Sequence, residues 1–278
     1  MRGKRYSNNK QFKKIILTII FLICVLTMII SGIMIFKWAK ENKENNDIID
    51  EIKNTILVDE NVDTVDKYNI DFDSLKQKNS DTIAWIKVNG TNIEYPVVKT
   101  TNNDYYMTHT FDKNYNSAGW IFMDYRNKFN GTDNNMVIYA HNRRDGSLFG
   151  TLKNILTEEW QTNTDNFIIP FITENENTGY QVFSVYRIEN EDYYITTNFG
   201  TDNEFQNFID IIKSRSVKDF DIDVNTEDHI LTLSTCADDN KYRVVLHAKK
   251  IKSEIQNKKY LVEANPTPGD AKDVIKEK

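Results

Sequence analysis

Cysteine is scarce in this chain, and the positions of the few cysteines exclude several kinds of protein. The 278 residues contain only two, Cys24 and Cys236. Cys24 lies in a long apolar run and Cys236 does not, so we expect no disulfide between them. No Cys-x-x-Cys or His-x-x-x-His spacing occurs, so we expect no metal and no cofactor, although scattered carboxylates leave calcium binding through loops open. An unpaired cysteine in an exported region indicates a reactive thiol.

Charge is absent from the 22 residues between Ile15 and Phe36. That length is sufficient for a helix to cross the hydrocarbon core of a membrane. No small-x-small cleavage site follows the run, which disfavours a cleaved signal peptide. All charged residues before the run are basic, which places the N-terminus in the cytoplasm. We therefore predict a cytoplasmic segment at 1–14, a single-pass transmembrane helix at 15–36 in the cell membrane, and an extracellular remainder.

Net positive charge is lacking beyond this anchor. The formal charge is −6 for the whole chain, and the first 14 residues carry six positive charges, so the remainder carries about −12. An acidic exterior argues against a nucleic-acid partner. A neutral peptide substrate remains compatible with it.

The segment from Ile230 to Cys236 reads as a strand that ends in a cysteine, and Tyr242 to Ala248 as a second strand. Side chains alternate along a strand, so a hairpin with Cys236 opposite Arg243 places a thiol beside a guanidinium. This register also pairs Ser234 with Val245 and Thr232 with His247. A nearby positive charge favours the nucleophilic thiolate. Alternatively, the cysteine is a small buried apolar residue and the arginine a surface charge.

Four histidines could serve as the partner of this thiol. His141 ends an apolar strand at 135–141 and opens a loop, where functional groups collect. His229 begins the cysteine strand, about 20 Å from the thiol, and His247 lies roughly 13 Å from its level. His109 lies in an irregular polar stretch. The position of His141 favours it as the partner.

Short apolar segments separated by polar turns dominate the middle of the chain. Asn89-Gly90 is a strong hairpin signal, and Pro96 predicts an edge or a bulge in its strand. We expect strands near 83–88, 91–99, 118–124, 135–141, 166–172, 180–188, 229–236 and 242–250, and helices at 72–79, 147–160 and 202–215. This pattern is typical of a closed or nearly closed β-barrel. Residues 37–66 have isoleucines at helical spacing and predict an amphipathic helical extension or spacer.

Several segments between roughly residues 70 and 250 carry a resemblance to a known family. They are Leu233-Ser234-Thr235-Cys236, Arg243, Tyr139-Ala140-His141-Asn142, Tyr95-Pro96-Val97-Val98, Asn103-Asp104-Tyr105-Tyr106 and Gly119-Trp120-Ile121-Phe122-Met123-Asp124-Tyr125-Arg126-Asn127. In these segments, which follow the order of the family, the chain resembles the class B sortases. It departs from the family at Ala140, where many relatives carry glycine.

The resemblance implies a mostly β fold: a closed barrel of about eight strands with an N-terminal helical extension and a helix in the connection before the cysteine strand. The catalytic domain would occupy residues 67–252. Residues 253–278 are polar and charged, and we expect a disordered tail there.

The resemblance also implies a transpeptidase. Cys236 would attack the carbonyl of a threonine in an Asn-Pro-x-Thr-like C-terminal sorting signal of a surface protein, and His141 would protonate the leaving amine. An amine of a peptidoglycan peptide or lipid-linked precursor would then resolve the thioester. Arg243 would stabilise the oxyanion or hold the peptide backbone. The candidates for substrate binding are Ser234, Asn103 and Met107.

Other interpretations remain open at this point. A sortase-fold pilin polymerase would use the same residues, and a non-catalytic, membrane-tethered binding module would not need the thiol. A papain-like protease places its cysteine before its histidine and at a helix N-terminus, unlike this chain. The cysteine transpeptidases of peptidoglycan would need His-Gly and Gly-Cys-x-Arg patterns, and both are absent.

Overall fold

The computed structural model describes residues 3–62, 64–189, 191–236 and 241–251, with the backbone alone for residues 3–10 and Cys236. The chain divides into two compact units, residues 1–47 and 48–278. The expected tail at 253–278 and the turn after Cys236 lie outside the described residues.

The first unit is the greater part of one helix, α1 (Gly3–Lys53). The apolar side chains between Ile15 and Phe36 are exposed. Among the described residues, this is the one helix long and apolar enough to cross a membrane. It is therefore a candidate membrane span.

The second unit begins with the last turns of α1. Ile49 and Ile52 are buried in the core of this unit. The helix ends at Lys53, and Ile56 lies in strand β1 (Ile56–Val58), which pairs with β2 (Tyr68–Ile70). The expectation of helix throughout 37–66 is therefore wrong after Lys53. The expected short helix follows as α2 (Phe72–Lys78), capped by the carboxylate of Asp71.

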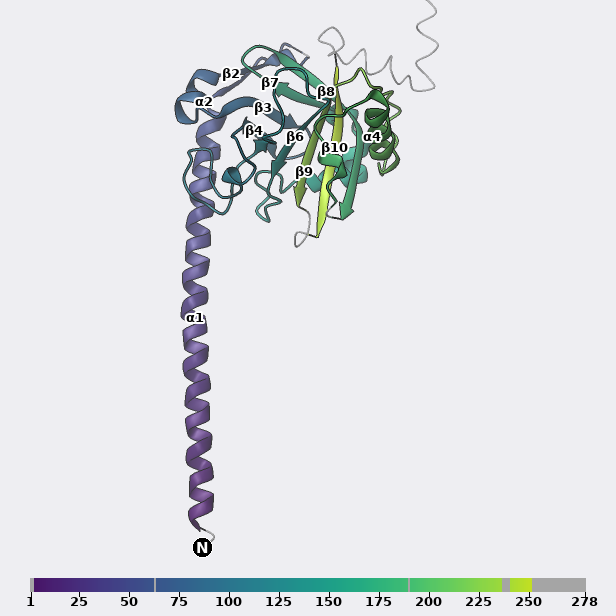
Figure 1. Ribbon diagram of the computed structural model, residues 1–278. Helices are drawn as coiled ribbons and strands as arrows, with labels where there is room; N and C mark the ends of the chain where they lie inside the picture. Colours follow the sequence, from purple (N-terminus) through teal and green to yellow (C-terminus); the bar gives the residue numbers. More distant parts are fainter. Residues whose placement is uncertain (1–2, 63, 190, 237–240, 252–278) are drawn as a thin grey trace, which may run out of the picture. The chain divides into compact units, whose positions relative to one another are not determined.

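Eight strands close a barrel in the order β10-β8-β7-β3-β4-β5-β6-β9 (Figure 1). This confirms the predicted mostly β fold. Its core contains fully buried aromatic side chains such as Trp85 and Trp120. The strands are β3 (Thr82–Val88), β4 (Ile93–Val98), β5 (Phe122–Met123), β6 (Asn135–Ala140), β7 (Ile168–Ile172), β8 (Asn177–Glu189), β9 (Ile230–Cys236) and β10 (Tyr242–Ile251).

Pro96 lies in β4, opposite Trp85 of β3. On its other side β4 pairs with β5 only at Val98, so no ladder hydrogen bond is needed from the proline. The carbonyl of Pro96 instead accepts a hydrogen bond from the indole of Trp120 at 3.0 Å. Strand β4 is therefore neither an edge strand nor bulged at Pro96, so that expectation is wrong, and the sparse pairing with β5 accommodates the proline instead.

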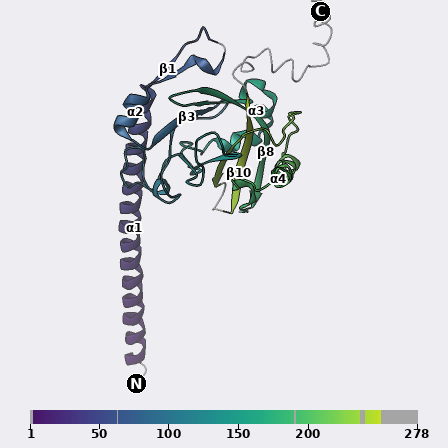
Figure 2. The ribbon, with the colours of Figure 1, turned by 45° about the horizontal axis from the view of Figure 1, so that its top comes forward.

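Two helical connections flank the barrel. The connection before β9 holds α4 (Asp202–Ser214), which confirms the helix predicted there. The side chain of Thr201 caps this helix. It lies beside β8 in both views (Figures 1 and 2), and the Ser184 hydroxyl of β8 donates to the carbonyl of Ile212 at 2.6 Å.

The single helix expected at 147–160 is wrong. The chain instead forms a 3₁₀ helix (Leu152–Leu156) and the short helix α3 (Glu158–Thr162). Leu148 has a φ of 50°, which is incompatible with a right-handed helix. Thr157 then caps α3 with its side chain, so the apolar periodicity continues across a break.

Candidate active site

A groove with a cavity volume of about 240 Å³ lies at one end of the barrel, where β6 and β9 end and β10 begins. Five of the six residues that we nominated from the sequence line it: Asn103, Met107, His141, Ser234 and Arg243. These residues come from four separate parts of the chain. The fold therefore brings the nominated side chains to one place.

The backbone register places Cys236 between the other two catalytic candidates. In the antiparallel pair of β9 and β10, Cys236 is opposite Arg243, and the predicted hairpin register is confirmed. In the parallel pair of β6 and β9, Ala140 is opposite Thr235, so the next positions on the two strands are His141 and Cys236. Neighbouring strands lie about 4.8 Å apart. The three residues therefore occupy adjacent strands at the same level.

A side-chain hydrogen bond reinforces this end of the sheet. The hydroxyl of Thr235 donates to the carbonyl of Ala140 at 2.7 Å. The bond joins β9 to β6 one residue before the cysteine and one before the histidine. It resists fraying where the two strands separate.

The ring of His141 is half-buried and has a defined orientation. Its Nε2 lies 2.8 Å from the carbonyl oxygen of Met107. A carbonyl can only accept a hydrogen bond, so Nε2 carries the proton. The other ring nitrogen, Nδ1, is then available to exchange a proton within the groove.

Gly119 makes this orientation possible. Its φ is 63°, and a Cβ here would lie 2.5 Å from the carbonyl of Tyr106 and 2.9 Å from that of Met107. The same Cβ would lie 3.1 Å from Cδ2 of His141. Only glycine permits both this conformation and this close approach. The segment that carries the Met107 carbonyl can therefore reach the histidine.

Arg243 lines the groove, and one of its guanidinium donors lacks a partner among the described residues. Its Nη1 is buried and has no hydrogen-bond partner among the residues that the structure describes. A buried donor without an acceptor is costly, particularly on a charged group. Arg243 is therefore suited to bind an oxygen atom of a ligand in the groove.

The three candidates for substrate binding differ in what their polar groups contact. The Ser234 hydroxyl is buried and lies 2.9 Å from the hydroxyl of Tyr194. The Asn103 amide donates to the Asp124 carboxylate at 3.2 Å and accepts from the backbone N–H of Tyr125 at 2.9 Å. Met107 is more than a third exposed, and its carbonyl binds the histidine.

The segment before α4 forms a wall of the groove that sequence reasoning missed. Asp192, Tyr194 and Ile195 line the cavity. They lie in or next to a 3₁₀ turn (Tyr193–Ile195) with no strand or helix periodicity. The sequence signal available was the position of this turn shortly before the helix expected in the connection to the cysteine strand.

The remaining histidines are committed elsewhere. His109 stacks on Tyr105 with ring centroids 4.1 Å apart. His247 is fully buried between the hydroxyls of Tyr186 and Thr232, both at 2.8 Å, and burial lowers its pKa to about 3. It therefore stays neutral and cannot supply a cation to the thiol.

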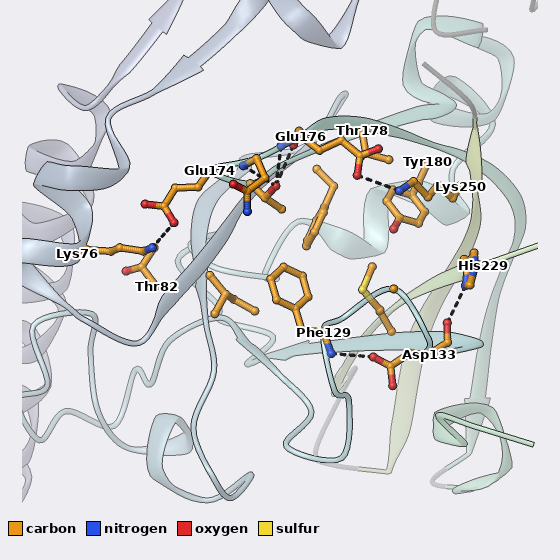
Figure 3. A pocket seen from close by; sticks show the side chains of 16 residues that line it. Lys76, Thr82, Phe129, Asp133, Glu174, Glu176, Thr178, Tyr180, His229 and Lys250 are labelled. Carbon is orange, nitrogen blue, oxygen red and sulfur yellow. Dashed lines mark hydrogen bonds and ion pairs between the residues drawn. The ribbon is translucent and has the colours of Figure 1, made fainter. Parts of the chain in front are cut away.

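His229 lies at the other end of the barrel, where β9 begins. There it lines a second cavity of about 380 Å³ with Asp133 and Lys250 (Figure 3). Its Nδ1 lies 2.9 Å from the backbone carbonyl of Asp133. The rim of this cavity carries ion pairs, such as that between Lys250 and Glu176 at 3.0 Å. The second cavity is remote from the cysteine and is not the catalytic one.

The groove combines the parts that acyl transfer needs: a nucleophile position, a proton carrier and an oxyanion donor. Cys236 is the only thiol position in the barrel. Within the part of the chain that the structure describes, one ring nitrogen of His141 and Nη1 of Arg243 have no hydrogen-bond partner. These parts favour covalent catalysis through a thioester.

Comparisons with known proteins identify relatives that are cysteine enzymes of one family. The profile of the sortase domain matches residues 86–251. Sortase B of Staphylococcus aureus is 33% identical over 241 residues, which cover 85% of this chain and 97% of the relative. The crystal structure of sortase B from B. anthracis in complex with AAEK1 is 34% identical, with a TM-score of 0.66, and covers 77% of this chain and 99% of that chain.

A Staphylococcus aureus sortase B–substrate complex is 36% identical with a TM-score of 0.61; the match covers 66% of this chain and 85% of that chain. The family match, the identity over nearly the whole of a relative and the barrel topology lead to one conclusion. The chain belongs to the sortase family of cysteine transpeptidases and is a class B member.

Proposed function

We propose that this enzyme cleaves an Asn-Pro-x-Thr-like sorting signal after its threonine and transfers the protein to an amine of the cell wall. The observation that carries the proposal is the register of β6, β9 and β10, which sets Cys236 between His141 and Arg243. A sortase B with this fold forms a substrate complex, which supports a peptide ligand here.

The roles of the three residues follow from their chemistry. The Cys236 thiolate attacks the threonine carbonyl, and Arg243 donates to the resulting oxyanion or to the neighbouring peptide backbone. His141 gives a proton to the leaving amine as the carbon–nitrogen bond breaks, and a thioester remains. An incoming amine loses its proton to His141, attacks the thioester and releases the thiol.

The groove supplies the substrate contacts in this proposal. Asn103, Met107 and Ser234 line it, together with Tyr194 and Ile195. Apolar and aromatic walls with a few polar groups are typical of ligand-binding sites. Surface proteins with a C-terminal sorting signal are the proposed substrates, and a peptidoglycan peptide or its lipid-linked precursor is the proposed acceptor.

A panel of quenched fluorescent peptides tests this substrate class. We expect the Asn-Pro-x-Thr peptides to be cleaved between threonine and the next residue. With hydroxylamine as the acceptor, mass spectrometry should detect a threonine hydroxamate, because the amine resolves a thioester. Scrambled peptides of the same composition are the control. Cleavage at another bond, or no hydroxamate, would contradict the proposal.

We also propose that α1 anchors the enzyme by residues 15–36, with residues 1–14 in the cytoplasm and a catalytic domain at 67–252 outside. The long apolar run and the basic residues before it support this orientation.

A chain that begins at residue 37 is therefore expected to be soluble and to cleave the peptides as fast as the full chain in detergent. Ile49 and Ile52 are retained in it, because they belong to the buried core of the second unit. Size-exclusion chromatography and initial rates check the result. Aggregation of this fragment beside an active full chain would show that the boundary is wrong.

A further inference from the structure

Asp124 follows β5, directly behind residues that line the groove, and its side chain is completely buried. Its Oδ1 accepts from the backbone N–H and from Nε of Arg126, both at 2.9 Å. Its Oδ2 accepts from Nη2 of Arg126 at 2.7 Å, from the Tyr139 hydroxyl at 2.8 Å and from the Asn103 amide at 3.2 Å. One buried carboxylate thus receives five hydrogen bonds.

The donors belong to three different walls of the groove. Asn103 and Tyr139 line the groove directly. Nη2 of Arg126 also donates to the backbone carbonyl of Ile195 at 2.9 Å, and Ile195 lines the third wall. Tyr139 lies on β6, two residues before His141, which directly follows the strand, and both side chains line the groove.

Asp124 also determines how Asn103 is oriented. A carboxylate only accepts and a backbone N–H only donates, so the Asn103 Nδ2 must face Asp124 and its Oδ1 must face Tyr125. The second hydrogen of Nδ2 has no partner among the described residues, and Asn103 lines the groove. The carboxylate therefore selects which group of the amide can meet a ligand.

We infer that Asp124 is a positioning residue of this sortase, which holds the three walls of the groove in the geometry that binds the peptide. The inference rests on the proposed function, in which this groove receives the sorting signal. Asp124 itself does not line the groove, and it acts through Arg126, Tyr139 and Asn103.

The charged state of the carboxylate supports this role. Burial acts to raise the pKa of Asp124, but hydrogen bonds from Arg126 and Tyr139 outweigh it and hold the pKa below its usual range. Burial and the nearby carboxylate raise the pKa of Tyr139, so its hydroxyl remains a donor. The contacts therefore persist at neutral pH.

The catalytic register does not depend on this carboxylate. Cys236, His141 and Arg243 are placed by the backbone ladders of β6, β9 and β10. Loss of the Asp124 charge should loosen substrate binding and leave the chemical step intact. This separation distinguishes a positioning role from a general loss of folding.

The test is Asp124→Asn in the full chain in detergent, assayed with the Asn-Pro-x-Thr peptide. Asparagine keeps the shape but offers a single acceptor oxygen and introduces an N–H that faces other donors. Hydrogen bonds to a charged group are strong enough that we expect KM to rise about tenfold, with kcat within about threefold of the wild type. Labelling of Cys236 by a small thiol reagent should keep its wild-type rate.

Asp133→Asn is the matched control. Asp133 is also buried and accepts from the backbone N–H groups of Lys128 and Phe129, at 3.1 and 2.9 Å, but it lines the second cavity. Its removal should leave KM unchanged. An equal rise of KM in this variant, or a wild-type KM in Asp124→Asn, would overturn the inference.

Tyr139→Phe and Arg126→Lys decide the question if Asp124→Asn does not fold. Each removes part of the network and keeps the carboxylate, and each should raise KM severalfold with kcat retained. Unchanged KM values in both folded variants would overturn the inference. Cleavage of the peptide by the wild type tests the proposed function. The role of Asp124 is tested separately, by the differences in KM between the variants and the wild type.

Discussion

Replacement of Cys236 by alanine is expected to eliminate peptide cleavage and transfer while the barrel remains folded. A thioester requires a cysteine, and Cys236 is the one cysteine of the sequence outside the apolar run. Removal of a covalent nucleophile typically costs on the order of 10⁴- to 10⁶-fold in rate. Initial rates with the Asn-Pro-x-Thr peptide measure the loss. Circular dichroism checks that the fold is retained.

Cys24→Ala is the matched control for this variant. Cys24 is exposed on α1 within the apolar run and lies outside the barrel. Its replacement should leave cleavage unchanged. In the Cys24→Ala background, a thiol-reactive sulfone should label Cys236 and stop cleavage in proportion to labelling. Cleavage that continues after complete labelling would show that the reaction does not pass through this thiol.

The hairpin of β9 and β10 shows how much local pattern can predict. A hairpin assumed to set Cys236 opposite Arg243 also pairs Ser234 with Val245 and Thr232 with His247, and the structure has all three pairs. Hairpin partners are close in sequence, so few registers compete, and one buried face selects among them.

The position of His141 could not be derived in the same way. It depends on the parallel pairing of β6 with β9, between residues about ninety positions apart. No local signal specifies a parallel neighbour at such a distance, and the family resemblance supplied the link. The wall formed by Tyr194 and Ile195 was missed because a 3₁₀ turn has no periodicity that sequence analysis could detect.

The role of Asp124 shows the same limit for polar residues. Its segment matched the family, yet no pattern in the sequence distinguished this carboxylate from its neighbours. Its partners Asn103, Tyr139 and Arg126 come from different segments and converge only in the folded barrel. The break in the helix expected at 147–160 was missed for a different reason. Apolar residues continue at helical spacing past Leu148 and Thr157, where the helix is interrupted.

Arg243→Lys is expected to lower kcat/KM about a hundredfold, although the charge is kept, because loss of one preorganised oxyanion donor costs about 3 kcal/mol. The guanidinium is a planar fork that can donate two parallel hydrogen bonds, whereas an ammonium is a point charge on a flexible stem. Nη1 of Arg243 is buried with no partner among the described residues, so it is the donor that the substitution removes.

Arg187→Lys provides the matched control for this substitution. Arg187 lies on the neighbouring strand β8, where its guanidinium stacks on the ring of Tyr242 at 4.1 Å, and it does not line the groove. Its replacement should leave kcat/KM within about twofold, because its side chain is exposed and lies outside the groove. The comparison separates the loss of the Arg243 guanidinium from a general effect of lysine on this side of the barrel. If Arg243→Lys keeps its activity within about threefold of the wild type, Arg243 supplies positive charge alone, and the oxyanion must be stabilised by other groups, such as backbone N–H donors.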